Sequence, residues 1–131
     1  MVGFAGTAAD CIAIIELLAK EIERYPGQTL RACLSLAQMW RQGRMRKLEG
    51  SVIVTDPSIT IMMDGSGNCI EVENGVVAIG SGGHYALSAA LGMLDDERMT
   101  AENVCHRAMK IAADLCVFTN HNTMLKVLNT D

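Results

Sequence analysis

The chain has 131 residues, half of them hydrophobic, which is enough apolar material for the core of one domain. Its formal net charge of -4 argues against a nucleic-acid binder, because such proteins concentrate surplus lysine and arginine on one face. No hydrophobic run reaches the roughly 20 residues that a membrane-spanning helix needs, and no basic signal-peptide region opens the chain, so we expect a soluble protein without a membrane partner.

Cysteine and histidine spacing argues against a structural zinc site. The cysteines are odd in number and form no Cys-x-x-Cys pair, which predicts reduced thiols: Cys11, Cys33, Cys69, Cys105 and Cys116. Three of them lie in hydrophobic helical stretches, where we expect unreactive core thiols: Cys11, Cys33 and Cys105. The histidines are too far apart to share a helical face and are expected at the surface or in structural hydrogen bonds: His84, His106 and His121.

Two helices are predicted in the first third of the chain. Thr7 to Asp10 has the form of a capping box, so a helix begins there and runs to the break at Tyr25-Pro26-Gly27. Hydrophobic residues at steps of three and four predict its buried face: Cys11, Ile14, Ile15, Leu18 and Ile22.

The second helix is predicted to restart near Gln28 or Thr29. Its hydrophobic stripe is predicted at Leu30, Cys33, Leu34, Ala37 and Met45. A basic stretch near its end is read as a solvated face that complements the helix dipole: Arg41, Arg44, Arg46 and Lys47. Gly43 is expected to kink this helix, because glycine costs roughly 1 kcal/mol of helix propensity.

The periodicity changes after Gly50. Short hydrophobic runs separated by turn residues predict four strands at 51–55, 59–63, 69–73 and 76–79, the last buried on both faces. Helices are then predicted over 84–94 and from a Thr100 cap through Leu115. This order favours an α+β fold in which a sheet lies between two helical layers.

The glycine-rich turn Gly80 to Gly83 is the sharpest local signal. Its amides and the following helix dipole suit an anion, but it lacks the lysine of a phosphate loop, and tight strand-to-helix packing explains it equally well. Ser81 does not lie in a Gly-x-Ser-x-Gly elbow, so a serine hydrolase is disfavoured.

Several segments, in order, resemble one family over nearly the whole chain. They are Gly3-Phe4-Ala5-Gly6-Thr7-Ala8-Ala9-Asp10, Leu36-Ala37-Gln38-Met39-Trp40-Arg41, Arg46-Lys47-Leu48-Glu49, Asp64-Gly65-Ser66-Gly67-Asn68, Val77-Ala78-Ile79-Gly80-Ser81-Gly82-Gly83 and Lys110-Ile111-Ala112-Ala113-Asp114-Leu115-Cys116-Val117-Phe118-Thr119-Asn120. Together they resemble the HslV-type (ClpQ) threonine peptidases, bacterial-type relatives of the proteasome β subunits. The resemblance implies an N-terminal-nucleophile αββα sandwich and a single, partial domain over residues 1–131.

The family's nucleophile has no counterpart here. The resemblance implies an N-terminal threonine whose own amine acts as base, tuned by a nearby lysine, and both precede the Gly-Phe-Ala-Gly motif. Only Met1 and Val2 stand before that motif, so we expect an incomplete sandwich without its leading strands, marginally stable and inactive alone. A truncated gene model, an alternative start or a degenerate paralogue would each produce such a chain.

The resemblance carries over part of the site. Gly6 matches the residue whose backbone N–H faces the developing oxyanion, and Ser81 matches the serine near the threonine amine. Ala113, Cys116 and Thr119 match a loop whose backbone carbonyls bind a sodium ion. Ordinary turn and cap structure is the alternative for these five positions.

The function implied is the proteolytic subunit of an HslUV-type ATP-dependent protease. The family assembles as stacked hexameric rings, receives unfolded proteins from an HslU-type AAA+ unfoldase, and uses ATP only through that partner. The compartment would be cytoplasmic for a bacterial source and mitochondrial for a protist. The alternatives are a non-catalytic ring-forming paralogue and, more remotely, a small anion-binding module built on Gly80 to Gly83.

Overall fold

The structure, a computed structural model, describes residues 1–42 and 49–130. The chain divides into two compact units, a sheet unit (Met1–Glu73) and a helix-pair unit (Asn74–Asn129), so the single domain stays a prediction. The predicted kink at Gly43 and the residues Met45 and Arg44, Arg46 and Lys47 lie outside the described residues. Within the described ranges, no helix has the length and hydrophobicity to cross a membrane.

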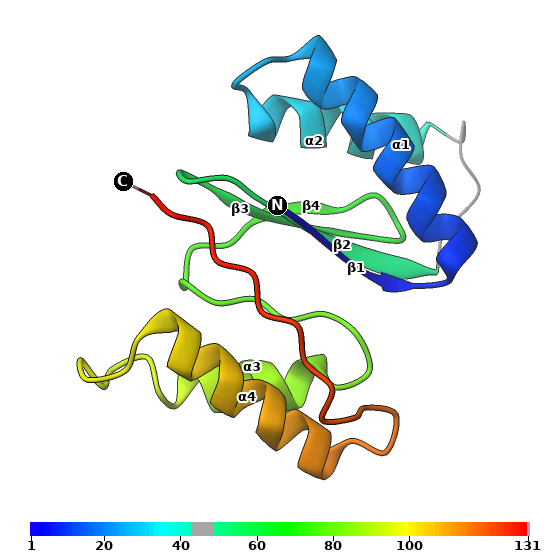
Figure 1. Ribbon diagram of the computed structural model, residues 1–131. Coiled ribbons are helices and arrows are strands. Elements are labelled where there is room, and N and C mark those ends of the chain that lie inside the picture. Colours follow the sequence, from blue (N-terminus) through cyan, green and yellow to red (C-terminus); the bar gives the residue numbers. More distant parts are fainter. Residues whose placement is uncertain (43–48, 131) are drawn as a thin grey trace. The chain divides into compact units, whose positions relative to one another are not determined.

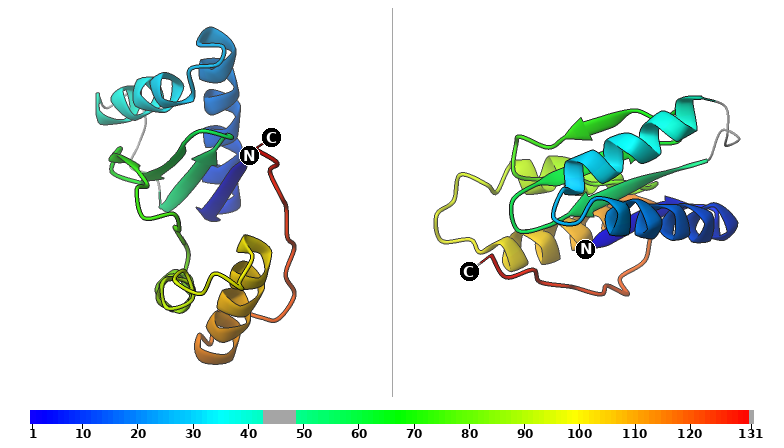
Figure 2. Two further views of the ribbon diagram at one scale, coloured as in Figure 1. Left: turned by 90° about the vertical axis from the view of Figure 1, so that its left-hand side faces the viewer. Right: turned by 90° about the horizontal axis from the view of Figure 1, so that it is seen from above.

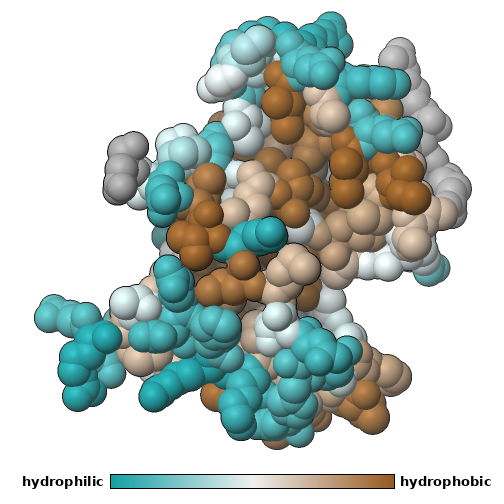
Figure 3. Space-filling model, viewed as in Figure 1, coloured by the Kyte–Doolittle hydropathy of each residue, from teal (hydrophilic) through white to brown (hydrophobic). Residues whose placement is uncertain are grey.

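Helix α1 (Ala8–Arg24) begins at the predicted cap, where Thr7 Oγ1 accepts a hydrogen bond from the Asp10 backbone N–H at 3.4 Å. Its buried face is Ile14, Leu18 and Glu21, with Asp10 buried at the first turn. The predicted face was partly wrong, because Ile15 and Ile22 are 44% and 40% exposed. The helix carries two hydrophobic stripes, and packing buries only one, which leaves hydrophobic side chains on the surface of this unit (Figure 3).

Helix α2 (Thr29–Arg41) contacts α1 and begins at the predicted position. Cys33 and Ala37 are buried as predicted. Leu30 and Leu34 were predicted to be buried, but they are 38% and 44% exposed. The buried face is displaced around the helix, to Ala32, Cys33, Leu36, Ala37 and Trp40. Full burial of a side chain such as Leu36 contributes about 1.5–3 kcal/mol to the free energy of unfolding. The face of α2 that packs against the sheet therefore determines much of the stability of this core.

The sheet is antiparallel, in the order β1 (Val2–Gly6), β2 (Gly50–Thr55), β3 (Thr60–Asp64) and β4 (Cys69–Glu71). The opening Gly-Phe-Ala-Gly stretch therefore forms a strand at one edge of the sheet. Helices α1 and α2 lie over one face of the sheet (Figures 1 and 2). The strand register places one row of hydrophobic residues on a common face across all four strands: Phe4, Val52, Met63 and Cys69. Alternate residues of β2 and β3 thus form the core with α1 and α2.

The helix-pair unit consists of α3 (Gly83–Leu91) and α4 (Ala101–Leu115), packed through small side chains such as Ala86, Ala90 and Ala108. Thr100 caps α4 as predicted, accepting the Asn103 N–H at 3.2 Å. The strand predicted over 76–79 is not formed, and these four residues are only half-buried. Val76 and Ala78 pack against the helix pair instead, because a four-residue hydrophobic run does not distinguish a strand from a packed loop.

All five cysteines are free thiols. Cys33 is fully buried as predicted, and burial raises the pKa of its thiol to about 12, so it stays protonated. Cys105 is exposed, which contradicts its predicted core position. The buried face of α4 consists of Val104, Ala108 and Ala112, and Cys105 lies next to that face. The three histidines are exposed, as expected.

Candidate functional site

Gly6 ends β1 at a point where two backbones come unusually close. It pairs with Gly50 of β2 and has a φ of +153°. A Cβ added at Gly6 would lie 2.3 Å from the Glu49 carbonyl oxygen, and one added at Gly50 would lie 2.6 Å from the Ala5 carbonyl oxygen. Only glycine fits at either position. Gly50, which the sequence reasoning did not single out, is thus the structural partner of Gly6.

Asp10 fixes the backbone on the other side of the same junction. Its buried side chain accepts a hydrogen bond from the Glu49 N–H, with Oδ2 at 3.3 Å. Since Asp10 lies in the first turn of α1 and Glu49 directly precedes β2, the bond ties the start of the helix to the start of the strand. The junction at Gly6 is therefore held from both sides, although the oxyanion role of the Gly6 N–H stays a prediction.

Ser81 lies in a tight turn at the start of α3. Gly80 adopts a φ of +95°, and the Gly83 N–H donates to the Gly80 carbonyl oxygen at 3.0 Å, which closes the turn. Gly82 and Gly83 are buried, whereas Ser81 between Gly80 and Gly82 is exposed. The Ser81 side chain is therefore exposed to solvent on a turn that is closed by a backbone hydrogen bond.

The end of α4 contacts this turn. Cys116 caps α4, and its N–H donates to the Ala112 carbonyl oxygen at 2.8 Å. The Thr119 hydroxyl contacts two carbonyl oxygens that end the helix, Cys116 O at 2.7 Å and Ala112 O at 3.1 Å. A Cβ added at Gly82 would lie 2.7 Å from Thr119 Cγ2.

The structure thus brings together four of the five predicted positions within the helix-pair unit. Cys116 and Thr119 lie against the glycine beside Ser81, and Ala113 belongs to the last turn of α4. Gly6 lies in the sheet unit. Among the described residues, no group of three or more His, Cys, Asp or Glu side chains is placed to hold a metal ion.

A charged network that the sequence reasoning missed follows the same loop. His121 Nε2 lies 2.6 Å from Asp114 Oδ1, and the Lys110 ammonium donates to Asp114 Oδ2 at 2.8 Å. These contacts, Lys110 first and then His121, lower the pKa of the Asp114 carboxyl below its ordinary value. The three side chains are exposed, so the network orients the loop more than it stabilises the protein.

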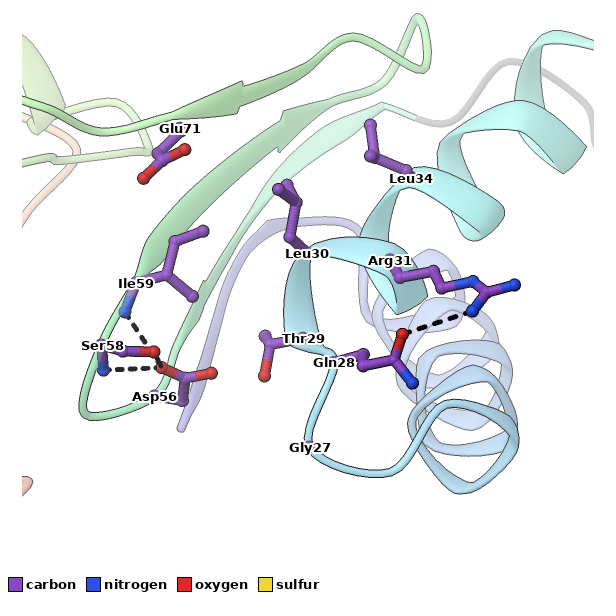
Figure 4. Close-up of a pocket in the computed structure, with 10 residues that line it drawn as sticks. All are labelled: Gly27, Gln28, Thr29, Leu30, Arg31, Leu34, Asp56, Ser58, Ile59 and Glu71. Atoms are coloured by element: carbon purple, nitrogen blue, oxygen red, sulfur yellow. Dashed lines mark hydrogen bonds between the residues drawn. The ribbon is translucent and has the colours of Figure 1, made fainter.

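The sheet unit also holds an open cleft of about 500 Å³ (Figure 4). Leu30, Leu34 and Ile59 supply its hydrophobic wall, and two carboxylates lie on its strand side, Asp56 and Glu71. This cleft could not be predicted from the sequence, since its residues come from α2, the β2–β3 turn and β4, which only the tertiary fold brings together.

Asp56 is the most strongly perturbed carboxylate of the described residues. Hydrogen bonds lower the pKa of Asp56 to about 2, and the bond from the Thr29 hydroxyl is the largest cause. The Ser58 N–H and the Ile59 N–H, at 2.7 and 3.0 Å from Asp56 Oδ1, also lower the pKa. The carboxylate thus closes the β2–β3 turn and faces the first residue of α2.

Replacing Asp56 with asparagine is expected to give a pH-dependent loss of stability. Because the folded-state pKa lies below the unfolded one, the charged carboxylate stabilises the fold above pH ~4, and this stabilisation disappears as the pH falls toward 2. We expect a gap of about 1 kcal/mol at pH 7 after allowing for solvent screening, measured by urea unfolding at pH 7, 4 and 2.5. A gap that is the same at all three pH values would contradict the assignment.

Known proteins resemble this chain along most of its length. Residues 1–128 match the family described as Proteasome subunit. The chain is 46% identical over 125 residues to the ATP-dependent protease subunit HslV of Wolbachia sp. subsp. Brugia malayi (strain TRS), a match that covers 95% of this chain and 71% of that protein.

Solved structures agree. Eukaryotic HslV from Trypanosoma brucei matches with a TM-score of 0.86 at 43% identity, covering 92% of this chain and 70% of that one. Thiobacillus denitrificans BPH matches with a TM-score of 0.66 at 17% identity, covering 91% and 69%, and at that identity shows the fold alone. The predicted α+β fold of the N-terminal-nucleophile type is therefore confirmed, here in partial form. The chain belongs to the proteasome subunit family and, within it, to the HslV group.

Proposed function

We propose that this chain belongs to the proteolytic subunit of an HslUV-type ATP-dependent protease, a threonine-type endopeptidase, and that these 131 residues, which carry no N-terminal threonine, are inactive alone. The observation that carries the proposal is the 46% identity to an HslV subunit over 95% of the chain. The agreement of the fold with a eukaryotic HslV, at a TM-score of 0.86, supports it further.

Assembly follows from the same likeness. Copies of the chain form a ring, and we propose two stacked hexameric rings that receive unfolded proteins from an HslU-type AAA+ unfoldase. ATP is hydrolysed by that partner and not by this chain. The complex works in the cytoplasm if the source is bacterial and in mitochondria if the source is a protist.

Two residues are proposed to support the reaction of an N-terminal threonine. The Gly6 backbone N–H donates to the oxyanion, a donor of the kind that supplies about 3 kcal/mol of transition-state stabilisation. Its support is the rigid junction with Gly50, because a donor must be fixed before charge develops. Ser81 lies near the threonine amine, on a turn that holds its backbone in one geometry.

A sodium ion is proposed to bind the backbone carbonyls of Ala113, Cys116 and Thr119. Carbonyl oxygens are hard ligands suited to such a cation, and the C-terminal end of α4 carries partial negative charge. Because the ligands are backbone atoms, the thiol of Cys116 and the methyl of Ala113 do not oppose binding.

Removal of sodium is expected to lower the melting temperature. A ligand at about 100 times its Kd stabilises the folded state by about 2.7 kcal/mol, and choline is too large to replace sodium between carbonyls. The measurement is thermal unfolding in sodium chloride and in choline chloride at equal ionic strength, with lithium and potassium series to rank cations by size. Equal melting temperatures in all four salts would remove the sodium proposal.

The function itself is tested on the protein isolated from its own cells with a C-terminal tag. We expect an AAA+ ATPase to co-purify, unfolded casein to be degraded only when ATP is present, and a threonine-directed inhibitor to abolish this activity. Rings that form without hydrolysis, and without an inhibitor-modified threonine detectable by mass spectrometry, would identify a non-catalytic paralogue. Absence of both rings and hydrolysis would overturn the proposal.

A further inference from the structure

The contact between Thr119 and Gly82 joins two segments 37 positions apart in the sequence. Thr119 Cγ2 occupies the space that a side chain at position 82 would need, since a Cβ there would lie 2.7 Å away. Ala112 and Cys116 lie behind it, at 3.5 and 3.8 Å from the same point. The glycine turn is therefore packed against the end of α4 without room for one additional carbon atom.

Hydrogen bonds of its hydroxyl and its backbone N–H hold Thr119 in place. Its hydroxyl donates to the Cys116 carbonyl oxygen at 2.7 Å, with the Ala112 carbonyl oxygen at 3.1 Å, and its backbone N–H donates to Cys116 O at 3.1 Å. The Cys116 carbonyl oxygen, which lies at the helix cap, thereby gains its hydrogen bonds from Thr119, whereas Ala112 O already accepts the Cys116 N–H. These bonds fix the side-chain rotamer, so the methyl group has one position.

We infer that Thr119 is a positioning residue for the turn that carries Ser81. Its hydroxyl fixes the side chain to the end of α4, and its methyl group fixes Gly82, so the neighbouring Ser81 backbone is held by side-chain packing from a distant segment. The catalytic consequence rests on the proposed function, in which Ser81 supports the threonine amine. The role shares one atom with the proposed cation site, the Cys116 carbonyl oxygen, and Thr119→Ser leaves the hydroxyl that contacts this oxygen unchanged.

Size complementarity gives a direct test. In Gly82→Ala, the added methyl collides with Thr119 Cγ2, so the turn is displaced. Thr119→Ser removes Cγ2 but keeps the hydroxyl and the backbone carbonyl, so the double variant has room again. Gly92→Ala is the matched control, because the nearest atoms to a Cβ there are at 3.6 Å and its backbone is helical.

Two measurements on the intact protein are made with these four variants. Amide hydrogen exchange of the 78–86 segment is expected to be about tenfold faster in Gly82→Ala and to return to the Thr119→Ser rate in the double variant, a coupling typical of residues in contact. In peptide hydrolysis, Gly82→Ala is expected to lower kcat about tenfold with little change in KM, because the turn acts on the reacting groups and not on substrate affinity.

The outcomes separate the two proposals. A double variant that exchanges as fast as Gly82→Ala overturns the positioning role, and so does an active enzyme whose kcat is unchanged by Gly82→Ala. Hydrolysis absent from the unsubstituted protein overturns the proposed function, while the exchange data still decide whether Thr119 positions the turn. Faster exchange in Gly92→Ala would assign the effect to α3 as a whole and overturn the inference.

Discussion

Gly6→Ala is expected to destabilise the sheet unit by about 4 kcal/mol, combining backbone strain of about 1–3 kcal/mol with overpacking of similar size. The φ of +153° is one that alanine rarely adopts, and its Cβ would lie 2.3 Å from the Glu49 carbonyl oxygen and 2.8 Å from Gly50 Cα. Both obstacles are backbone atoms, so no side-chain rotation relieves the contact. Urea unfolding followed by circular dichroism measures the loss.

Gly3→Ala is the matched control for this substitution. Gly3 lies in the same strand, yet nothing comes within 4 Å of a Cβ added there. We expect a change of less than about 0.5 kcal/mol, as for most surface substitutions. Equal destabilisation by the two variants would mean that β1 is sensitive to any added side chain, and would contradict the close approach at Gly6.

Leu36→Ala is expected to cost about 3 kcal/mol, within the range of about 2–5 kcal/mol for a buried leucine whose removal leaves a cavity. The Leu36 side chain is 0% exposed and belongs to the core formed with Ile14, Leu18 and the strand residues Val52 and Met63. Thermal and urea unfolding of the same samples give the change in free energy.

Leu34→Ala tests which face of α2 is buried. The Leu34 side chain is 44% exposed, so its truncation is expected to cost less than about 0.5 kcal/mol. The hydrophobic spacing alone placed Leu34 and not Leu36 in the core. A larger loss for Leu34→Ala than for Leu36→Ala would support the spacing and contradict the structure.

Local signals of the sequence were reliable at element ends. The caps at Thr7 and Thr100 were predicted correctly because each depends on one hydroxyl and an N–H three residues later. Strands β2 and β3 were predicted from short hydrophobic runs separated by turn residues, and a third run predicted β4. Resemblance of the motifs, from Gly3 to Asn120, was sufficient to predict the family.

The buried faces of the helices and the pairing partners of the strands were harder to predict. Ile15, Ile22 and Leu34 fit a hydrophobic stripe but are exposed, because the sequence offers more hydrophobic residues than one packed face accepts. The run 76–79 reads as a strand, yet strands depend on a pairing partner that no local pattern specifies. The pairing of Gly6 with Gly50 and the cleft beside Asp56 were not predicted, because both are formed by segments that lie far apart in the sequence.

The sequence by itself determined the helix starts, the three strands β2 to β4, the reduced cysteines and the family, because these follow from short-range chemistry and from ordered motifs. Only the tertiary structure decided which helix faces are buried, why positions 6 and 82 must be glycine, and that Thr119 contacts the turn beside Ser81. Those properties depend on atoms brought within van der Waals distance by residues far apart in the chain. Packing at that distance is set by the whole fold and leaves no local trace in the sequence.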